Sequence, residues 1–204
     1  MSRQKEHEFK NLLTMQEYQQ LLQTYSFSAP FRQTNLYFDT ATQQLRRLGC
    51  GLRIRLFKDH AEQTLKIPAS SDHTLWEITD AVPLALAQQQ LKIQQPSQIS
   101  RQLQQYHITV AQLQLIGYAQ TLRRQVELSS GLLVLDQTNY ADGTQDYEIE
   151  LEVQAPTTTL TDFSTWLRTQ QIAQRPVKNK VARAVQHYVA GEKQYENLVH
   201  MLFN

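Results

Sequence analysis

The feature that most constrains this sequence is a strict alternation of charged and apolar residues along short segments. Tyr147–Val153 reads YEIELEV, in which three carboxylates alternate with four hydrophobic residues. The N-terminal stretch follows the same rule, with Glu6, Glu8 and Lys10 at every second position. Alternate residues of a β-strand share a face, about 6 to 7 Å apart. Each segment therefore predicts a strand with one charged and one apolar face.

The same pattern recurs along the chain and predicts an antiparallel meander. Leu52–Phe57 carries Arg53 and Arg55 on one face and three aliphatic residues on the other. Further predicted strands bear Lys66, Glu77, Arg123, Glu127 and Asp136, and Glu152 extends the acidic series of the last strand. An Asp-Gly pair at Asp142-Gly143 is typical of a hairpin turn.

Helical periodicity interrupts this meander. We expect a helical insertion over about 83–110 and a C-terminal helix over about 180–203. The apolar face of that last helix would contain Val181, Val185, Tyr188 and Val189. Thr14 and Glu17 form a capping box for a first helix, and Thr161 or Asp162 is expected to cap another that runs through Gln171.

These elements predict a single α+β domain over residues 1–204. The chain has about eight strands with one apolar face each, and amphipathic helices that can cover a large apolar surface. A closed eight-stranded antiparallel β-barrel with helices packed outside buries all of these apolar faces. Against those helices we expect Leu52, Ile54, Trp76, Ile149 and Leu151 to pack. The charged faces must then point into the barrel.

A charged interior costs desolvation energy unless its groups are paired or solvated, so it indicates a functional cargo rather than a stability device. Arginine forks and lysine point charges are the usual partners of phosphate oxygens. Clustered carboxylates are the hard oxygen ligands that Mg²⁺ or Mn²⁺ prefers. Both kinds together predict a tunnel for a polyanion bridged to metal, such as an organic triphosphate or inorganic triphosphate.

The overall composition excludes some other classes. With 20 basic and 19 acidic residues the net charge is +1, which gives no global reason to expect nucleic acid or an anionic membrane as partner. The single Cys50 excludes an intrachain disulfide and fits a reducing compartment. The sequence has no apolar run of transmembrane length and no signal-peptide core. We therefore expect a cytoplasmic protein whose partner is a small-molecule triphosphate; the oligomeric state stays open.

The ordered charges also resemble a known family. The string Glu6-x-Glu8-x-Lys10 at the N-terminus resembles the signature of the CYTH superfamily, the triphosphate tunnel metalloenzymes. The resemblance covers essentially the whole chain and is closest to the small single-domain bacterial members. After that signature follow, in order, Tyr37–Thr40 (YFDT), Leu52-Arg53-x-Arg55, Leu65-Lys66, Glu77, Arg123, Asp136, Glu148-x-Glu150 and the late lysines.

The resemblance implies a role for each matching residue. Phosphate oxygens would be held by Lys10, Arg53, Arg55, Lys66, Arg123 and a late lysine, Lys180 or Lys178. One or two metal ions would be held by Glu6, Glu8, Asp136, Glu148 and Glu150. Glu148, Glu150 and Lys10 would be the catalytic set. A register slip would exchange Arg123 with Arg124, and Glu77, Glu127 and Glu152 are further tunnel candidates.

Three functions are compatible with such a tunnel. The first is a metal-dependent triphosphatase acting on inorganic triphosphate or a small organic triphosphate. The second is a class IV-type adenylate cyclase, for which the sequence shows no base-recognition feature. The third is a non-catalytic sensor that binds polyphosphate or a nucleotide without turnover.

Overall fold

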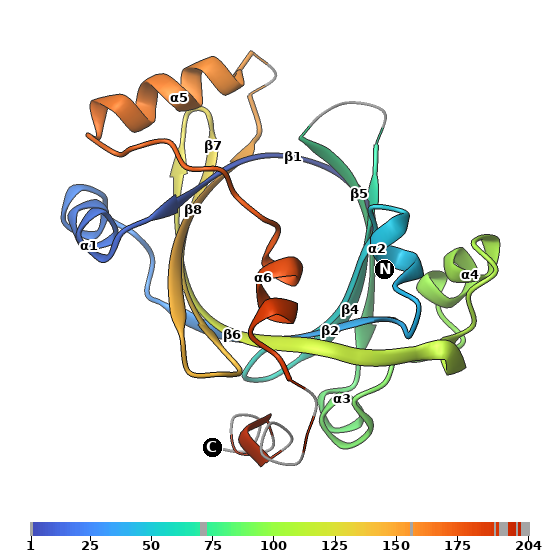
Figure 1. Cartoon of the computed structure of the whole chain (residues 1–204). Coiled ribbons are helices and arrows are strands. Elements are labelled where there is room, and N and C mark those ends of the chain that lie inside the picture. Colours follow the sequence, from blue (N-terminus) through green and yellow to red (C-terminus); the bar gives the residue numbers. More distant parts are fainter. Residues whose placement is uncertain are drawn as a thin grey trace.

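The computed structural model describes residues 2–69, 73–155, 157–189, 191, 196–198 and 200. Eight strands of this described part form a closed antiparallel barrel, as predicted. Their order is β1-β5-β4-β3-β2-β6-β7-β8, so it departs from the expected meander at β1, which lies between β5 and β8 rather than beside β2. Figure 1 looks along the barrel axis. The strands are β1 (Ser2–Leu13), β2 (Phe31–Thr40), β3 (Gly51–Leu56), β4 (Ala61–Pro68), β5 (Thr74–Val82), β6 (Leu113–Leu128), β7 (Gly131–Tyr140) and β8 (Gln145–Val153).

Helices occupy several of the connections between these strands, and two more follow β8. They are α1 (Met15–Thr24), α2 (Gln44–Arg47), α3 (Leu84–Gln90), α4 (Gln98–Gln105), α5 (Leu160–Thr169) and α6 (Lys180–Gln186), with a 3₁₀ turn, η1, at Val110–Gln112. The expected helical insertion thus corresponds to α3, α4 and η1. No helix in the described part of the chain is long and apolar enough to cross a membrane.

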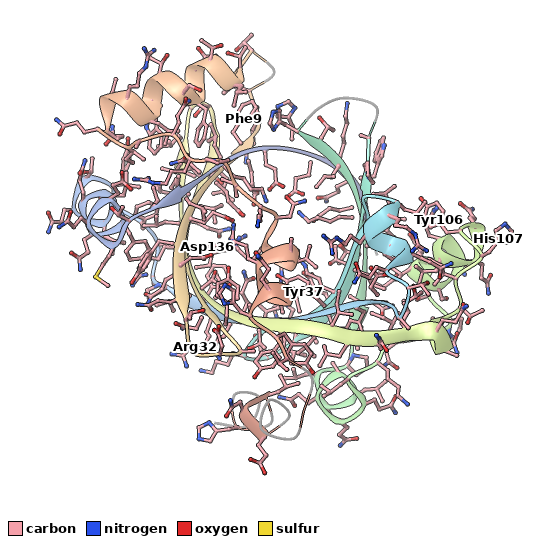
Figure 2. All side chains as sticks on the ribbon, in the orientation of Figure 1. Phe9, Arg32, Tyr37, Tyr106, His107 and Asp136 are labelled. Carbon is pink, nitrogen blue, oxygen red and sulfur yellow. The ribbon has the colours of Figure 1, made fainter. Side chains whose placement is uncertain are left out.

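The alternation read from the sequence sorts side chains between the two faces of the barrel wall. In β8, Ile149 and Leu151 face outward and pack with Phe9 and with Phe163 of α5. Glu148 and Glu150 lie on the other face, where Glu150 is opposite Lys10 of β1. Figure 2 shows Phe9 on the outer side of the ring, near α5, and Asp136 on the inner side. The polar faces therefore line the barrel.

Two apolar clusters join the barrel to helices on opposite sides of it. One contains Leu52 and Ile54 of β3 with Ile99 and Leu103 of α4, each at most 1% exposed. The other packs α1 and α5 against β1, β7 and β8. Burial of this aliphatic and aromatic surface supplies the main driving force for closing the barrel.

The helix caps follow the sequence closely at α1 and differ at α5. The Thr14 side chain accepts a hydrogen bond from the Glu17 backbone N–H, and the Glu17 carboxylate accepts one from the Thr14 backbone N–H, as predicted. For α5 the N-cap is Thr159, whose side chain binds the backbone of Asp162. The expected cap at Thr161 or Asp162 was wrong because Asp162 serves as the third helical residue of a capping box that begins earlier.

The last helix departs from the expected outside packing. In Figure 1, α6 lies within the outline of the ring, across one end of the barrel. Its Ala184 packs against Tyr37, Ala119 and Tyr140. Gly117 of β6 allows this approach, since a Cβ there would lie 3.1 Å from the Ala184 carbonyl carbon. The sequence therefore uses one glycine to bring α6 against the barrel wall.

The helix is also shorter than expected, because it ends at Gln186. The next residue, His187, stacks on Tyr140 at 4.8 Å and contacts Asp142 Oδ2 at 2.8 Å through its Nδ1. The chain leaves the helical path at this residue. As a result Val189, expected on the apolar helix face, is 75% exposed. Most of the predicted continuation toward residue 203 lies outside the described residues.

Candidate functional site

A polar cavity of about 400 Å³ lies within the barrel. Its wall is built from alternate residues of several strands, so the charges that were separated in sequence converge on one space. Most of the residues predicted to face inward line it: Glu6, Glu8, Lys10, Arg53, Arg55, Lys66, Glu77, Arg123, Glu150, Glu152 and Lys180.

The cations of β3 and β4 have carboxylate neighbours on β1, β4 and β5. Lys66 Nζ lies 2.5 Å from Glu6 Oε2 and 2.8 Å from Glu77 Oε1. The arginines are held less tightly: Arg53 Nη2 is 3.9 Å from Glu77, and Arg55 Nη1 is 3.4 Å from Glu62. Both guanidinium groups thus retain donors that can turn toward an anion in the cavity.

Three carboxylates meet in the opposite wall. Asp136 of β7 lies directly opposite Glu148 of β8, and Glu150 follows on the same face of β8. Oxygens from all three lie within 4.8 Å of one another, and all three residues are buried. A closely spaced set of hard oxygen donors suits Mg²⁺ or Mn²⁺. The donor set therefore fits the metal that the sequence predicted.

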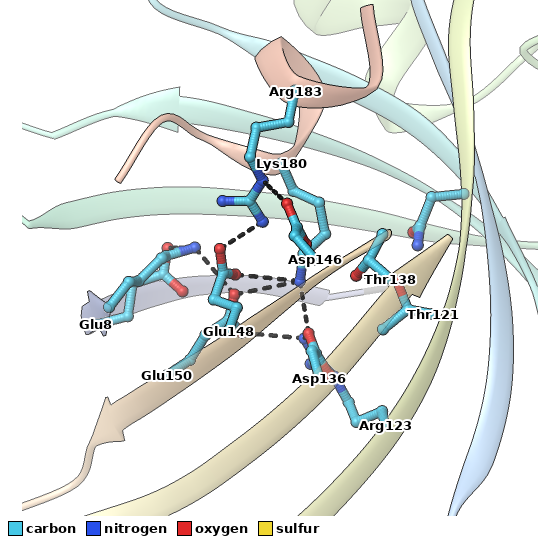
Figure 3. A network of polar contacts seen from close by, with 12 residues as sticks. Glu8, Thr121, Arg123, Asp136, Thr138, Asp146, Glu148, Glu150, Lys180 and Arg183 are labelled. Atoms are coloured by element: carbon cyan, nitrogen blue, oxygen red, sulfur yellow. Dashed lines mark hydrogen bonds and ion pairs between the residues drawn. The ribbon is translucent and has the colours of Figure 1, made fainter. Parts of the chain in front are cut away.

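The basic residues around these carboxylates come from three different elements. Arg123 of β6 donates two hydrogen bonds to Asp136 and one to Glu150. Lys10 Nζ of β1 lies 3.3 Å from Glu150 Oε1. Lys180, the first residue of α6, contacts the whole cluster (Figure 3). Cations therefore surround the acidic cluster on the side that faces the cavity.

The two glutamates of the cluster differ in their affinity for a proton. Burial, together with the charge of Glu150 and only partly offset by Lys180, raises the pKa of Glu148 to about 7. Burial acts on Glu150 as well, but neighbouring cations outweigh it and hold its pKa well below the usual range. Adjacent carboxylates with separated pKa values are characteristic of catalytic sites.

Arg183 is the main site residue that the sequence analysis did not identify. It is buried, with its Nη2 2.5 Å from Glu148 Oε2 and its Nε 2.9 Å from Asp146 Oδ2. Its Nε also donates to the hydroxyl of Tyr140. The spacing could have found it, because residues three apart on a helix share a face and Arg183 follows Lys180 by three.

The sequence left two choices open, between Arg123 and Arg124 and between Lys178 and Lys180, and the positions of these side chains in the structure distinguish them. Arg123 faces the cavity, whereas Arg124 donates to the hydroxyl of Tyr18 in α1. Lys180 reaches the carboxylates, whereas Lys178 is exposed. Glu127, a further candidate, is exposed as well.

The five predicted metal ligands divide into two groups. Asp136, Glu148 and Glu150 form the cluster. Glu6 and Glu8 lie elsewhere along β1, where Glu6 binds Lys66 and Glu8 binds Lys10 at 2.8 Å. Within the described residues, those two glutamates therefore act as partners of tunnel lysines.

The comparisons with known proteins agree with this geometry. The family model of the CYTH domain matches residues 4–185. The chain belongs to the CYTH family. Its sequence is 32% identical over 190 residues to YjbK of Bacillus subtilis (strain 168), whose name proposes a triphosphatase; the match covers 90% of this chain and 95% of YjbK.

Solved structures of CYTH-like barrels are also similar. A Bacillus halodurans protein, whose description proposes an adenylate cyclase, superimposes with a TM-score of 0.81 at 29% identity and covers 90% of this chain and 98% of its own. HpAC1 from Hippeastrum, described as having a dominant triphosphatase activity, gives 0.75 at 22% identity, covering 91% and 97%. At that identity the second likeness shows the fold alone.

Proposed function

We propose that this CYTH protein hydrolyses the terminal phosphoanhydride of a triphosphate with the help of a divalent metal ion. One observation carries the proposal: a cavity of about 400 Å³ inside the barrel presents a set of cations toward a buried cluster of three carboxylates. A chain of phosphates needs cations along its length, and a metal bound to it needs oxygen ligands on the protein. The name of the related YjbK supports the same activity.

In this proposal the tunnel cations hold the substrate. Arg53 and Arg55 would bind the phosphates, because their carboxylate partners lie at 3.9 and 3.4 Å and leave donors free. Lys66, Arg123 and Lys180 line the same cavity and complete the set. Lys10, beside Glu150, would stabilise negative charge on the transferred phosphoryl group.

Asp136, Glu148 and Glu150 would hold Mg²⁺ or Mn²⁺. When bound, such an ion neutralises phosphate charge and lowers the pKa of a coordinated water. The chain's own residues prepare the site: Arg123 orients Asp136 through two hydrogen bonds, and Arg183 holds Glu148 from the side of α6. With these partners in place, the carboxylates are preorganised before substrate arrives.

A class IV-type adenylate cyclase is the second candidate, favoured by the description of the Bacillus halodurans structure. It would use the same tunnel but join the ribose 3′-oxygen to the α-phosphate. Its products are cyclic AMP and pyrophosphate rather than orthophosphate, so product analysis distinguishes the two activities.

The deciding experiment measures phosphate release from inorganic triphosphate, ATP and thiamine triphosphate, each with Mg²⁺, Mn²⁺ or EDTA. We expect metal-dependent release that falls at least about a hundredfold in Glu148→Gln, which keeps the side-chain shape but removes a ligand charge. Glu127→Gln, a change of the same kind at an exposed position, should retain wild-type rates. Cyclic AMP from ATP would favour the cyclase, and tight binding with no product would favour a sensor.

We also propose that residues 1–204 act as one CYTH domain, since the family model spans 4–185 and α6, near the end of that span, completes the site. The free, buried Cys50 suits a reducing compartment, and we place the activity in the cytoplasm.

A further inference from the structure

The ammonium group of Lys180 occupies the middle of the acidic cluster. Its Nζ lies 2.5 Å from Asp136 Oδ2, 3.1 Å from Glu148 Oε1 and 3.5 Å from Glu150 Oε1. These are the three residues whose oxygens converge as a candidate metal site. Figure 3 shows the lysine reaching into the cluster from α6, with dashed contacts to the carboxylates. A cation of the protein thus occupies the position that suits a metal.

The two cations of α6 are anchored very differently. Arg183 is held by Asp146, by the hydroxyl of Tyr140 and by the backbone carbonyl of Lys178, in addition to Glu148. The ion pairs of Lys180 in the described structure are all with the three cluster carboxylates. Lys180 also lines the cavity, so its flexible stem can turn into the tunnel. Arg183 is therefore fixed, whereas Lys180 is free to exchange partners.

We propose that Lys180 is the resident counter-ion of the acidic cluster, and that it moves toward the triphosphate when metal takes its place. The inference rests on the proposed function, because it needs both a metal and a phosphate ligand. An ammonium group and a divalent cation repel each other at such short range, so the three carboxylates do not serve both at once. Phosphate in the tunnel gives the displaced ammonium a new anionic partner.

A thermodynamic consequence follows from this exchange. Metal binding alone must expel Lys180 from its ion pairs, which weakens metal affinity. Bound triphosphate gives the expelled ammonium group of Lys180 a new anionic partner. Metal and triphosphate should therefore each strengthen the binding of the other by the same factor. Removing the ammonium should then improve the affinity for metal alone and reduce the coupling, although Lys180 is itself part of the site.

The test measures Mn²⁺ binding by electron paramagnetic resonance, with and without inorganic triphosphate, in the wild type and in Lys180→Met. Without triphosphate, Lys180→Met should bind Mn²⁺ at least about tenfold more tightly, because one competing charge is gone. In the variant, triphosphate should enhance Mn²⁺ affinity less than it does in the wild type. Lys178→Met removes the same charge from the same segment at an exposed position and should leave both affinities unchanged.

Unchanged or weaker Mn²⁺ binding in folded Lys180→Met, without triphosphate, would overturn the inference. Lys180→Arg provides a second variant that keeps the charge, in case the first does not fold by circular dichroism. A guanidinium fork should hold the carboxylates more firmly and weaken Mn²⁺ binding, and tighter binding there would also contradict the exchange. The readout is independent of turnover: if wild-type protein releases no phosphate from any triphosphate, the proposed function fails while the Mn²⁺ result still decides the exchange.

Discussion

Arg123 and Asp136 lie directly opposite each other on β6 and β7, and the arginine grips the carboxylate with two hydrogen bonds. Arg123 Nε donates to Oδ1 at 2.8 Å and Nη2 to Oδ2 at 2.6 Å. Asp136 is fully buried, so its negative charge depends on this fork and on Lys180 for compensation. The β6–β7 pair is therefore part of the barrel wall and also positions part of the acidic cluster.

Breaking that pair should destabilise the fold. Arg123→Gln leaves a buried carboxylate short of a partner, and we expect a loss of about 3 kcal/mol or more in the free energy of unfolding, measured with urea. The neighbouring Arg124→Gln removes a hydrogen bond to Tyr18 on the outer side and should cost only about 1 kcal/mol. Equal losses from the two variants would show that the inward-facing fork has no special role.

Gly117→Ala should disturb the site without changing any charge. The added Cβ would lie 3.1 Å from the Ala184 carbonyl carbon and oxygen, so α6 must shift, and with it Lys180 and Arg183. Since small displacements of positioned groups cost large factors in rate, we expect phosphate release to fall by about tenfold or more. Gly191→Ala is the matched control, because Gly191 is exposed and a Cβ there meets nothing within 4 Å. A normal rate in Gly117→Ala would mean that the position of α6 does not matter for turnover.

The carboxyl of Glu152 should make stability depend on pH. Burial, aided by the charges of Glu150, Glu6 and Glu8 and opposed by Arg123, raises its pKa from 4.5 to about 7. Between those values the folded protein retains a proton that the unfolded chain releases, so the contribution of this group to stability falls as pH rises from 4.5 to about 7.

Replacing that carboxyl with an amide removes the effect. Relative to the wild type, Glu152→Gln should gain stability progressively over the same pH range and keep a constant advantage above it. Urea titrations at a series of pH values in EDTA measure this difference. Glu127→Gln, at an exposed position, should track the wild type throughout. A difference between wild type and Glu152→Gln that does not change with pH would contradict the raised pKa.

The cap of α5 gives a local test of the fold. Thr159 accepts from the backbone N–H of Asp162, so Thr159→Ala should cost about 1 kcal/mol of stability. Thr161→Ala, inside the exposed first turn, should be neutral or slightly stabilising, because alanine is the better helix former. Thermal unfolding of the two variants distinguishes the caps, and a larger loss from Thr161→Ala would contradict the structure.

The barrel and most of its lining were determined by the sequence itself. Side chains alternate between the two faces of a strand. The positions of Glu6, Arg53 and Glu148 within this alternation were therefore enough to assign them to the inner face before any partner strand was known. Closure of the sheet into a barrel was also predicted from the sequence. About eight strands with one apolar face each bury those faces most economically when the sheet closes and helices cover its outer surface.

Only the tertiary structure decided which of these charges meet. The alternation along each strand puts Glu6 and Glu148 on the same inner face. The register of the barrel, however, pairs Glu6 with Lys66 and groups Glu148 with Asp136 and Glu150. Register depends on contacts between strands distant in sequence, which alternation along one strand does not specify.

The placement of α6 is the clearest case. The sequence predicted an amphipathic helix here and a late lysine, Lys180 or Lys178, at the phosphates, but an isolated helix shows only which residues share a face. That Lys180 and Arg183 enter the acidic cluster depends on the close approach at Gly117 and on the chain leaving the helix at His187. Sequence periodicity determined the wall of the tunnel, and long-range packing decided where α6 lies and which cation the carboxylates hold.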